Sequence, residues 1–177
     1  MKWIKKIKYV PILDELCFFI MNRAFSYQKR KFYKTGNIHS SVRIGKNCKI
    51  DQNVFIDKHT YFGDNCHFYA GKNSSVHIGS YCAIGHNVHI KARTHDLSQP
   101  FPTDDGGNKR IEKNIWIGDK VWIGDNVFIR EGVSVGNNSV IGANSVVTKD
   151  IEAYSVYAGV PARKIKSIEL NSQNAQG

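Results

Sequence analysis

The sequence predicts an all-β protein, a parallel β-helix built from a six-residue repeat. Apolar residues recur at every sixth position in three registers, which begin at Ile38, Ile78 and Ile111. The fifth place of a hexad is small or β-branched, and the second place is often glycine. A period of six fits neither an α-helix nor a simple alternating strand, but it fits a short strand followed by a turn.

Three hexads would make one triangular coil of about 18 residues, and stacked coils would pair as parallel strands about 4.8 Å apart. A coil cannot bury its apolar face alone, so the inward column must be continuous and form one core. The first places are Ile38, Ile44, Ile50, Ile56, Phe62, Phe68, Ile78, Ile84, Ile90, Ile111, Ile117, Ile123, Ile129, Val135, Ile141 and Val147. The fifth places are Val42, Cys48, Val54, Thr60, Cys66, Cys82, Val88, Thr94, Ile115, Val121, Val127, Val133, Ser139, Ser145 and Ile151.

The N-terminal region, residues 1–37, is predicted to be a basic helical cap on the first coil. Residues 1–34 carry nine lysines and arginines but only two acidic residues, whereas the rest of the chain is nearly balanced in charge. Within Ile12–Arg30, apolar residues such as Leu16 and Ile20 fall at helical spacing. Solenoid ends are exposed sheet edges, and a helix would cover one of them. A second interpretation stays open, in which this cap also rests on an anionic membrane surface.

We expect no secretion signal, because Pro11, Asp14 and Glu15 interrupt the apolar stretch that follows the charged start. The longest uninterrupted apolar run, Leu16–Met21, is far shorter than the ~20 residues that a membrane-spanning helix needs. We therefore predict a cytoplasmic protein, which would be peripheral at the inner face of the membrane if the second interpretation holds.

The four cysteines of the sequence favour packing over a metal site or a disulfide. Cys48, Cys66 and Cys82 occupy the small fifth place of a hexad, where valine and threonine stand elsewhere. Cys48 and Cys66 should lie in neighbouring coils, close enough to bridge, but a cytoplasmic setting would keep their thiols reduced.

The repeat is interrupted by a protruding loop, residues 96–110, and a long loop that leaves a regular solenoid is usually functional. His95 stands at the base of this loop, and an imidazole with a pKa near neutrality suits a general base. If outward residues 18 positions apart stack, His77 lies beside His95, and His89 lies against Trp122 one coil later.

The β-helix is predicted to span residues 38–158, and residues 159–177 form a C-terminal cap and tail. Pro161 should end the last coil, and Ala162–Leu170 should form a short helix or strand. The polar residues 171–177 are expected to be disordered.

Three stretches, residues 76–95, 115–127 and 140–163, resemble the hexapeptide-repeat acetyltransferases, and within them the maltose/galactoside O-acetyltransferase type. The resemblance implies left-handed winding, a homotrimer, and acetyl-CoA as co-substrate without a metal. The acceptor-side acid of that family falls on Asn73 here, and its N-terminal acceptor-binding region has no counterpart in residues 1–37. The basic helical arm is closer in character to the polysaccharide O-acetyltransferases.

The resemblance also implies roles for single residues. The histidine that matches His95 removes the proton of the acceptor hydroxyl, the asparagine that matches Asn65 contacts the acceptor, and the tryptophan that matches Trp122 lines the site. A CoA groove between subunits would use Asp125, Ala143, Thr148, Lys149, Arg163 and Lys166. The cations in this set also suit the phosphates of CoA on chemical grounds.

We therefore predict an acetyl-CoA-dependent O-acetyltransferase that acts on a sugar hydroxyl of a cell-surface polysaccharide or its precursor, with no nucleic-acid partner. N-acetylation of a nucleotide-linked amino sugar is the alternative. A metal enzyme resembling the γ-class carbonic anhydrases would need three histidines around zinc, drawn from His77, His86, His89 and His95, although the His86–His89 spacing does not match that family. A non-catalytic scaffold would bind no acetyl-CoA.

Overall fold

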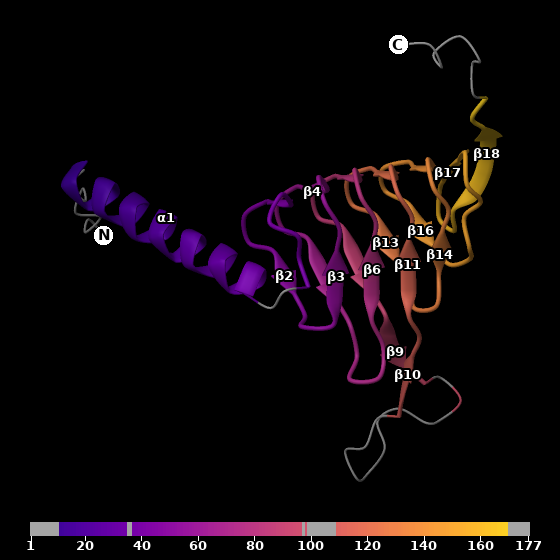
Figure 1. Cartoon of the computed structure of the whole chain (residues 1–177), viewed down its shortest axis with the longest axis horizontal. Helices are drawn as coiled ribbons and strands as arrows, with labels where there is room; N and C mark the ends of the chain where they lie inside the picture. The colour runs from indigo at the N-terminus through magenta and orange to yellow at the C-terminus, as the bar shows by residue number, and fades with distance from the viewer. Residues whose placement is uncertain (1–10, 35–36, 97, 99–108, 170–177) are drawn as a thin grey trace, which may run out of the picture.

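Figure 1 shows the computed structural model of the chain, which describes residues 11–34, 37–96, 98 and 109–169. Short strands follow one another along a column of parallel sheets, a long helix leads away from one end of the column, and a hairpin projects from its side (Figure 1). The predicted all-β class and β-helix architecture are confirmed.

Each regular coil contributes one strand to each of three sheets, here named A, B and C. Sheet A contains β3 (Val54–Ile56), β6 (Val76–Ile78), β11 (Ile115–Ile117) and β14 (Ser134–Val135). Sheet B contains β1 (Arg43–Ile44), β4 (Tyr61–Phe62), β7 (Ala83–Ile84), β12 (Trp122–Ile123), β15 (Val140–Ile141), β17 (Ser155–Ala158) and β18 (Arg163–Ser167). Sheet C contains β2 (Lys49–Ile50), β5 (His67–Tyr69), β8 (His89–Lys91), β13 (Phe128–Ile129) and β16 (Val146–Val147).

The predicted repeat positions build the core. Most first-place residues, from Ile38 to Val147, are buried, and the three fifth-place cysteines lie among them as free thiols. The thiols of Cys48 and Cys66 are neighbours, and the hydrogen bond that the Cys66 thiol donates to Cys48, together with burial, raises the pKa of Cys66. The cysteines therefore pack as predicted.

Asparagines shape the corner between sheets B and C. Asn65, Asn87, Asn126 and Asn144 have positive φ angles between 55° and 58°, a left-handed conformation that asparagine tolerates better than most residues. The Asn87 amide donates to Asn126 Oδ1, and the Asn126 amide donates to Asn144 Oδ1, both at 3.0 Å. These hydrogen bonds connect successive coils along one edge of the three-sided β-helix, which is called the prism below.

Two insertions break the 18-residue spacing, and both leave the prism at the corner between sheets C and A. Ile56 pairs with Ile78, and Ile78 pairs with Ile117, so that these neighbours are 22 and 39 residues apart in sequence. The longer insertion carries Thr94 and Ile111 out of the solenoid into a hairpin, where both are only half-buried. Their assignment to the core was therefore wrong.

The predicted histidine stacking was wrong for the same reason. His77 pairs with Trp116 rather than lying beside His95, because the longer insertion falls between them. Likewise, His89 pairs with Phe128 and not with Trp122, which belongs to another sheet.

The predicted N-terminal helix is confirmed as α1 (Pro11–Lys34), but it does not lie over the first coil as a cap. Leu16 and Ile20, expected to pack inward, are 51% and 56% exposed, and Phe32 near the end of the helix packs against the core. Figure 1 shows α1 extending away from the sheets as an arm. No helix among the described residues is long and apolar enough to cross a membrane, and residues 1–10 lie outside those described.

At the other end, the segment after Pro161 forms a strand, which was one of the two predicted outcomes. β18 pairs with β17 in antiparallel orientation and thereby extends sheet B past the last coil. The predicted disordered tail, residues 171–177, lies outside the described residues.

Candidate active site

The hairpin that leaves the prism carries His95. Its strands β9 (Arg93–His95) and β10 (Arg110–Glu112) are antiparallel, with Arg110 opposite His95 and Glu112 opposite Arg93. The tip of the hairpin, residues 99–108 of the predicted loop, lies outside the described residues. His95 thus stands on a two-stranded ribbon rather than on a regular coil.

The shorter insertion, which lies between β5 and β6, contacts the base of this hairpin. Glu112 Oε2 accepts a hydrogen bond of 2.6 Å from the backbone of Asn73, and Asn114 Oδ1 accepts one of 2.9 Å from the backbone of Ser75. A Cβ atom added to Gly71 would lie 2.2 Å from the Glu112 carboxyl carbon, so glycine permits this close approach. Asn73 stands at the position of the family's acceptor-side acid. Its backbone amide holds the carboxylate of Glu112 at the base of the hairpin.

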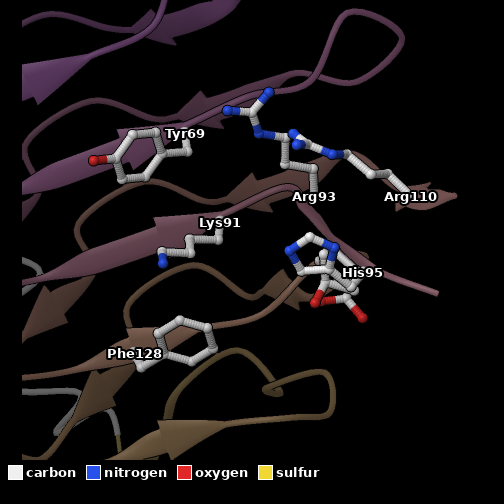
Figure 2. Close-up of a pocket in the computed structure, with 8 residues that line it drawn as sticks. Tyr69, Lys91, Arg93, His95, Arg110 and Phe128 are labelled. Atoms are coloured by element: carbon white, nitrogen blue, oxygen red, sulfur yellow. The ribbon is translucent and has the colours of Figure 1, made fainter. Parts of the chain in front are cut away.

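A cavity of about 330 Å³ lies between the hairpin and sheet C (Figure 2). The hairpin lines it with Arg93, Thr94, His95 and Arg110, and the strands of sheet C and the turn after them line it with Tyr69, Lys91, Phe128 and Glu131. A volume of this order is at the lower end of small-molecule sites, which suits a ligand the size of one or two sugar rings.

The charges in this cavity are mostly positive. The Lys91 ammonium lies 5.6 Å from the ring centroid of Tyr69 and 6.0 Å from that of Phe128, within range of cation–π attraction. The carboxylate of Glu131 is buried and pairs with the Arg130 guanidinium, which raises the pKa of Arg130. In the part of the chain that the structure describes, no carboxylate forms an ion pair with Lys91, Arg93 or Arg110.

These cations, and Glu131, were missed in the sequence. A signal was present for two of them, because Arg93 and Arg110 flank the interruption, at the point where the chain leaves and rejoins the coils. Their proximity becomes visible only once β9 and β10 are paired. Glu131 has no comparable signal, since it sits in an ordinary turn after β13.

The other predicted acceptor residues lie elsewhere on the single chain. Asn65 is at the corner between sheets B and C, where the turn between the two sheets requires its left-handed backbone conformation. Trp122 points outward from sheet B and is 59% exposed. Neither residue lines the cavity that holds His95. Their roles toward an acceptor stay predictions.

The predicted CoA-binding residues lie along the later coils. Asp125 Oδ1 accepts a 2.7 Å hydrogen bond from the backbone of His86, and Ala143 follows one coil later at the same corner. Thr148 and Lys149 follow β16, whereas Arg163 and Lys166 are exposed on β18. The Arg163 guanidinium donates to the carbonyl of Ala162 at 2.9 Å. Their role toward CoA stays a prediction.

The histidines of the metal-enzyme alternative have other neighbours. His77 is stacked between Phe55 and Trp116, at 4.7 and 3.9 Å between ring centroids. His86 Nδ1 accepts a backbone hydrogen bond from Asp64, and His89 lies against His67. Among the described residues of the single chain, no three histidine, cysteine or acidic side chains are grouped so that they could hold a metal ion. The metal-enzyme alternative gains no support from this arrangement.

Comparison with known proteins identifies the family. The family described as bacterial transferase hexapeptide (six repeats) matches residues 114–149, and the hexapeptide repeat of succinyl-transferase matches residues 35–58. Among curated protein sequences, none matches the chain.

Three solved structures are similar over most of their length. A maltose O-acetyltransferase from Clostridium difficile 630 is 31% identical, with a TM-score of 0.70 over 81% of this chain and 77% of that chain. A galactoside acetyltransferase in complex with coenzyme A is 29% identical, with a TM-score of 0.62 over 84% of this chain and 82% of that chain. A polysialic acid O-acetyltransferase is 25% identical, with a TM-score of 0.58 over 77% of this chain and 66% of that chain.

The chain belongs to the hexapeptide-repeat acetyltransferase family, and its fold is the left-handed β-helix of that family. It is accordingly an acyltransferase, which excludes the non-catalytic scaffold. The expected co-substrate, acetyl-CoA, agrees with this membership.

Proposed function

We propose that this enzyme transfers the acetyl group of acetyl-CoA to a sugar hydroxyl, in a cell-surface polysaccharide or its precursor, with His95 as general base. The observation that carries the proposal is the position of His95 on the wall of a cavity of sugar size. Sugar O-acetyltransferases among the similar structures support the choice of acceptor class.

The reaction would proceed by direct transfer. The His95 imidazole accepts the proton of the acceptor hydroxyl, and the oxygen attacks the carbonyl carbon of the acetyl thioester. The tetrahedral intermediate collapses as the carbon–sulfur bond breaks. The imidazolium returns its proton to the departing thiolate, so the products are an acetyl ester and free CoA, and His95 is again neutral.

Acetyl-CoA would be held by the later coils. Lys149, Arg163 and Lys166 are exposed cations there, as phosphate groups of CoA require, and Asp125, Ala143 and Thr148 complete the set implied by the family.

A homotrimer forms part of the proposal. On the single chain, His95 lies at the corner between sheets C and A, whereas Asn65 and Asp125 lie at the corner between sheets B and C. Cyclic association would place the second corner of one subunit against the hairpin of the next. The dispersal of the predicted site over two corners therefore supports a trimeric enzyme with sites between its subunits.

Peripheral contact with an anionic membrane is the further part of the proposal. The arm α1 exposes large apolar side chains between Leu16 and Met21 and at Tyr27, and the ten residues before it include four lysines. A helix that exposes apolar side chains next to a basic extension suits the interface of an anionic bilayer. Such contact would place a cytoplasmic enzyme beside membrane-bound glycan precursors.

An acceptor screen tests the proposed function. Purified enzyme is incubated with isotopically labelled acetyl-CoA and a panel of free sugars, amino sugars and nucleotide-linked amino sugars, and products are identified by mass spectrometry. We expect acetylated sugars from which mild alkali removes the label, because esters are cleaved and amides are not. Alkali-stable product formed only from amino sugars would instead establish the N-acetyltransferase alternative.

A further inference from the structure

The described lining of the cavity beside His95 carries a cluster of positive charges. Among the residues that the structure describes, three cations, Lys91, Arg93 and Arg110, line the cavity together with one carboxylate, that of Glu131. That carboxylate is already paired with Arg130, which does not line the cavity. The charge of the three cations is therefore not balanced by the acid beside them.

The pairing of the hairpin places both arginines on the same face as the base. Side chains alternate along a strand, so Arg93 and His95 project from the same face of β9. Directly opposed residues of an antiparallel pair share a face, so Arg110 projects beside His95. Figure 2 shows the two guanidinium groups and the imidazole along the hairpin, with Lys91 on the neighbouring strand of sheet C.

A second acid, Glu112 in the described part of the hairpin, is engaged at the base of the hairpin. Glu112, opposite Arg93, accepts a hydrogen bond from the backbone of Asn73 and packs against Gly71 at the base of the hairpin. No ion pair joins Glu112 to Arg93 among the described residues, and the aspartates of the hairpin tip lie outside them. Planar guanidinium groups bind carboxylates and phosphates through paired hydrogen bonds.

We propose that the acceptor is an acidic sugar, whose anionic group binds Arg93 and Arg110 while its hydroxyl lies at His95. The proposal rests on the proposed function and narrows its substrate class. Directly opposed residues are about 5 Å apart at Cα, so the anion would belong to the acetylated ring or to its neighbour. A ring carboxylate and a sugar phosphate share this chemistry.

The predicted CoA cations form a second group on the single chain. The predicted CoA cation Lys149 follows β16, which is two strands away from β8 along sheet C, or about 10 Å at the spacing of paired strands. The cavity cations and the predicted CoA cations are therefore separate groups, and substitutions can address each group alone.

The test compares each acidic sugar with its own neutral form. Galacturonic acid trimer and α2,8-linked sialic acid trimer are assayed beside their methyl esters, and galactose 6-phosphate beside galactose. Hydrogen bonds to charged groups predict a kcat/KM about ten- to hundredfold higher for the charged member of a pair. A preference within the carboxylate pairs or the phosphate pair supports the proposal and identifies which anion is bound.

Substitution of the arginines tests the assigned residues. Arg93→Gln and Arg110→Gln should each raise the KM for the preferred acidic acceptor about tenfold or more and narrow its advantage over the neutral form. The KM for acetyl-CoA should stay within about twofold of wild type. Lys109→Gln is the matched control, because it removes the same charge from a residue that adjoins Arg110 but does not line the cavity.

Two results would overturn the inference while leaving the proposed function intact. One is acetylation of the neutral members, or of maltose, at least as fast as of their charged counterparts. The other is a loss of acetyl-CoA affinity in the Arg93 and Arg110 variants as large as the loss of acceptor affinity. If no sugar of either kind is acetylated, the proposed function itself fails, and the inference fails with it.

Discussion

The proposed acid–base chemistry at His95 requires a side chain that is exposed to the cavity and held on a paired strand. The imidazole lies on β9, whose partner β10 is tied through Glu112 and Asn114 to the shorter insertion. A rigid support of this kind keeps a general base within reach of one hydroxyl. Loss of the base and loss of co-substrate binding can therefore be separated by substituting different residues.

Replacing His95 with alanine should lower kcat by roughly 10² to 10⁴, because no other side chain in the proposed mechanism accepts the hydroxyl proton. Steady-state kinetics give kcat, and titration calorimetry should show acetyl-CoA affinity close to that of wild type. His39→Ala serves as the control, since His39 lies on the first coil, outside the cavity. A His95 variant within threefold of wild-type kcat would refute the assignment.

Replacing Lys149 or Arg163 with alanine should weaken acetyl-CoA binding, by about ten- to hundredfold if each residue meets a phosphate oxygen. The KM for the acceptor should change little. Lys58→Ala, an exposed lysine between β3 and β4, is a matched control for the loss of charge. If wild type binds CoA and dephospho-CoA equally well, the 3′-phosphate is not recognised by these cations.

At the scale of elements, sheet C carries a column of outward cations and histidines. His67 lies between Lys49 and His89 in register, and the rings of His67 and His89 are 4.8 Å apart. Burial lowers the pKa of His67, and the charges of His89, Lys49 and Lys91 lower it further. Burial also lowers the pKa of His89, with a smaller contribution from Lys91. Both rings are thus best accommodated in the neutral form.

This column predicts a loss of stability in mild acid. In the unfolded chain these histidines bind protons near their ordinary pKa of about 6.5, whereas the folded chain binds them only at lower pH. The stabilisation is complete above that value and is lost as the pH falls below it. Urea unfolding measures the free energy of unfolding at pH 7.5 and at pH 5.5. The decrease in this free energy between the two pH values should be smaller for the double variant His67→Gln/His89→Gln than for wild type. An equal difference in the two proteins would show that other groups control the pH dependence.

The elements also show which parts of the molecule can be predicted from sequence. The regular coils could be predicted, because a repeat of six constrains the same inward positions again and again. The register across the insertions could not, because 22 and 39 residues between stacked isoleucines leave no periodic signal. His95 could be predicted because it lies beside the interruption of the repeat. The proximity of Arg93 and Arg110 to it could not, because it depends on the pairing of two strands that are far apart in sequence.

At the scale of the whole molecule, the prism and the arm present different surfaces. The helical spacing of apolar residues correctly predicted α1. This spacing does not indicate whether the apolar side chains are buried by the rest of the chain or by another molecule or membrane. Phe18 and Met21 are 68% and 71% exposed on this arm. Exposed apolar side chains on a helix beside a basic segment are the basis of the membrane prediction.

Neutralising the basic segment tests that prediction. Changing Lys2, Lys5, Lys6 and Lys8 to glutamine should weaken binding to vesicles containing phosphatidylserine by on the order of 10² to 10³, because each basic residue near an anionic surface contributes about 1 kcal/mol. Co-sedimentation measures the binding, which should also fall with added salt. Vesicles of phosphatidylcholine alone are the control. Wild-type enzyme that ignores anionic vesicles at low salt would contradict membrane contact.

In the proposed reaction, the acetyl group passes directly from acetyl-CoA to a sugar hydroxyl at His95. A rapid-quench single-turnover experiment with labelled acetyl-CoA and the best acceptor from the screen tests this step. The amount of label in CoA, in protein and in carbohydrate is measured over time. Direct transfer predicts that label leaves CoA and enters carbohydrate at one rate, as an alkali-labile ester, with no label bound to protein. Label that accumulates on the protein before it reaches the sugar, or that never reaches carbohydrate, would contradict it.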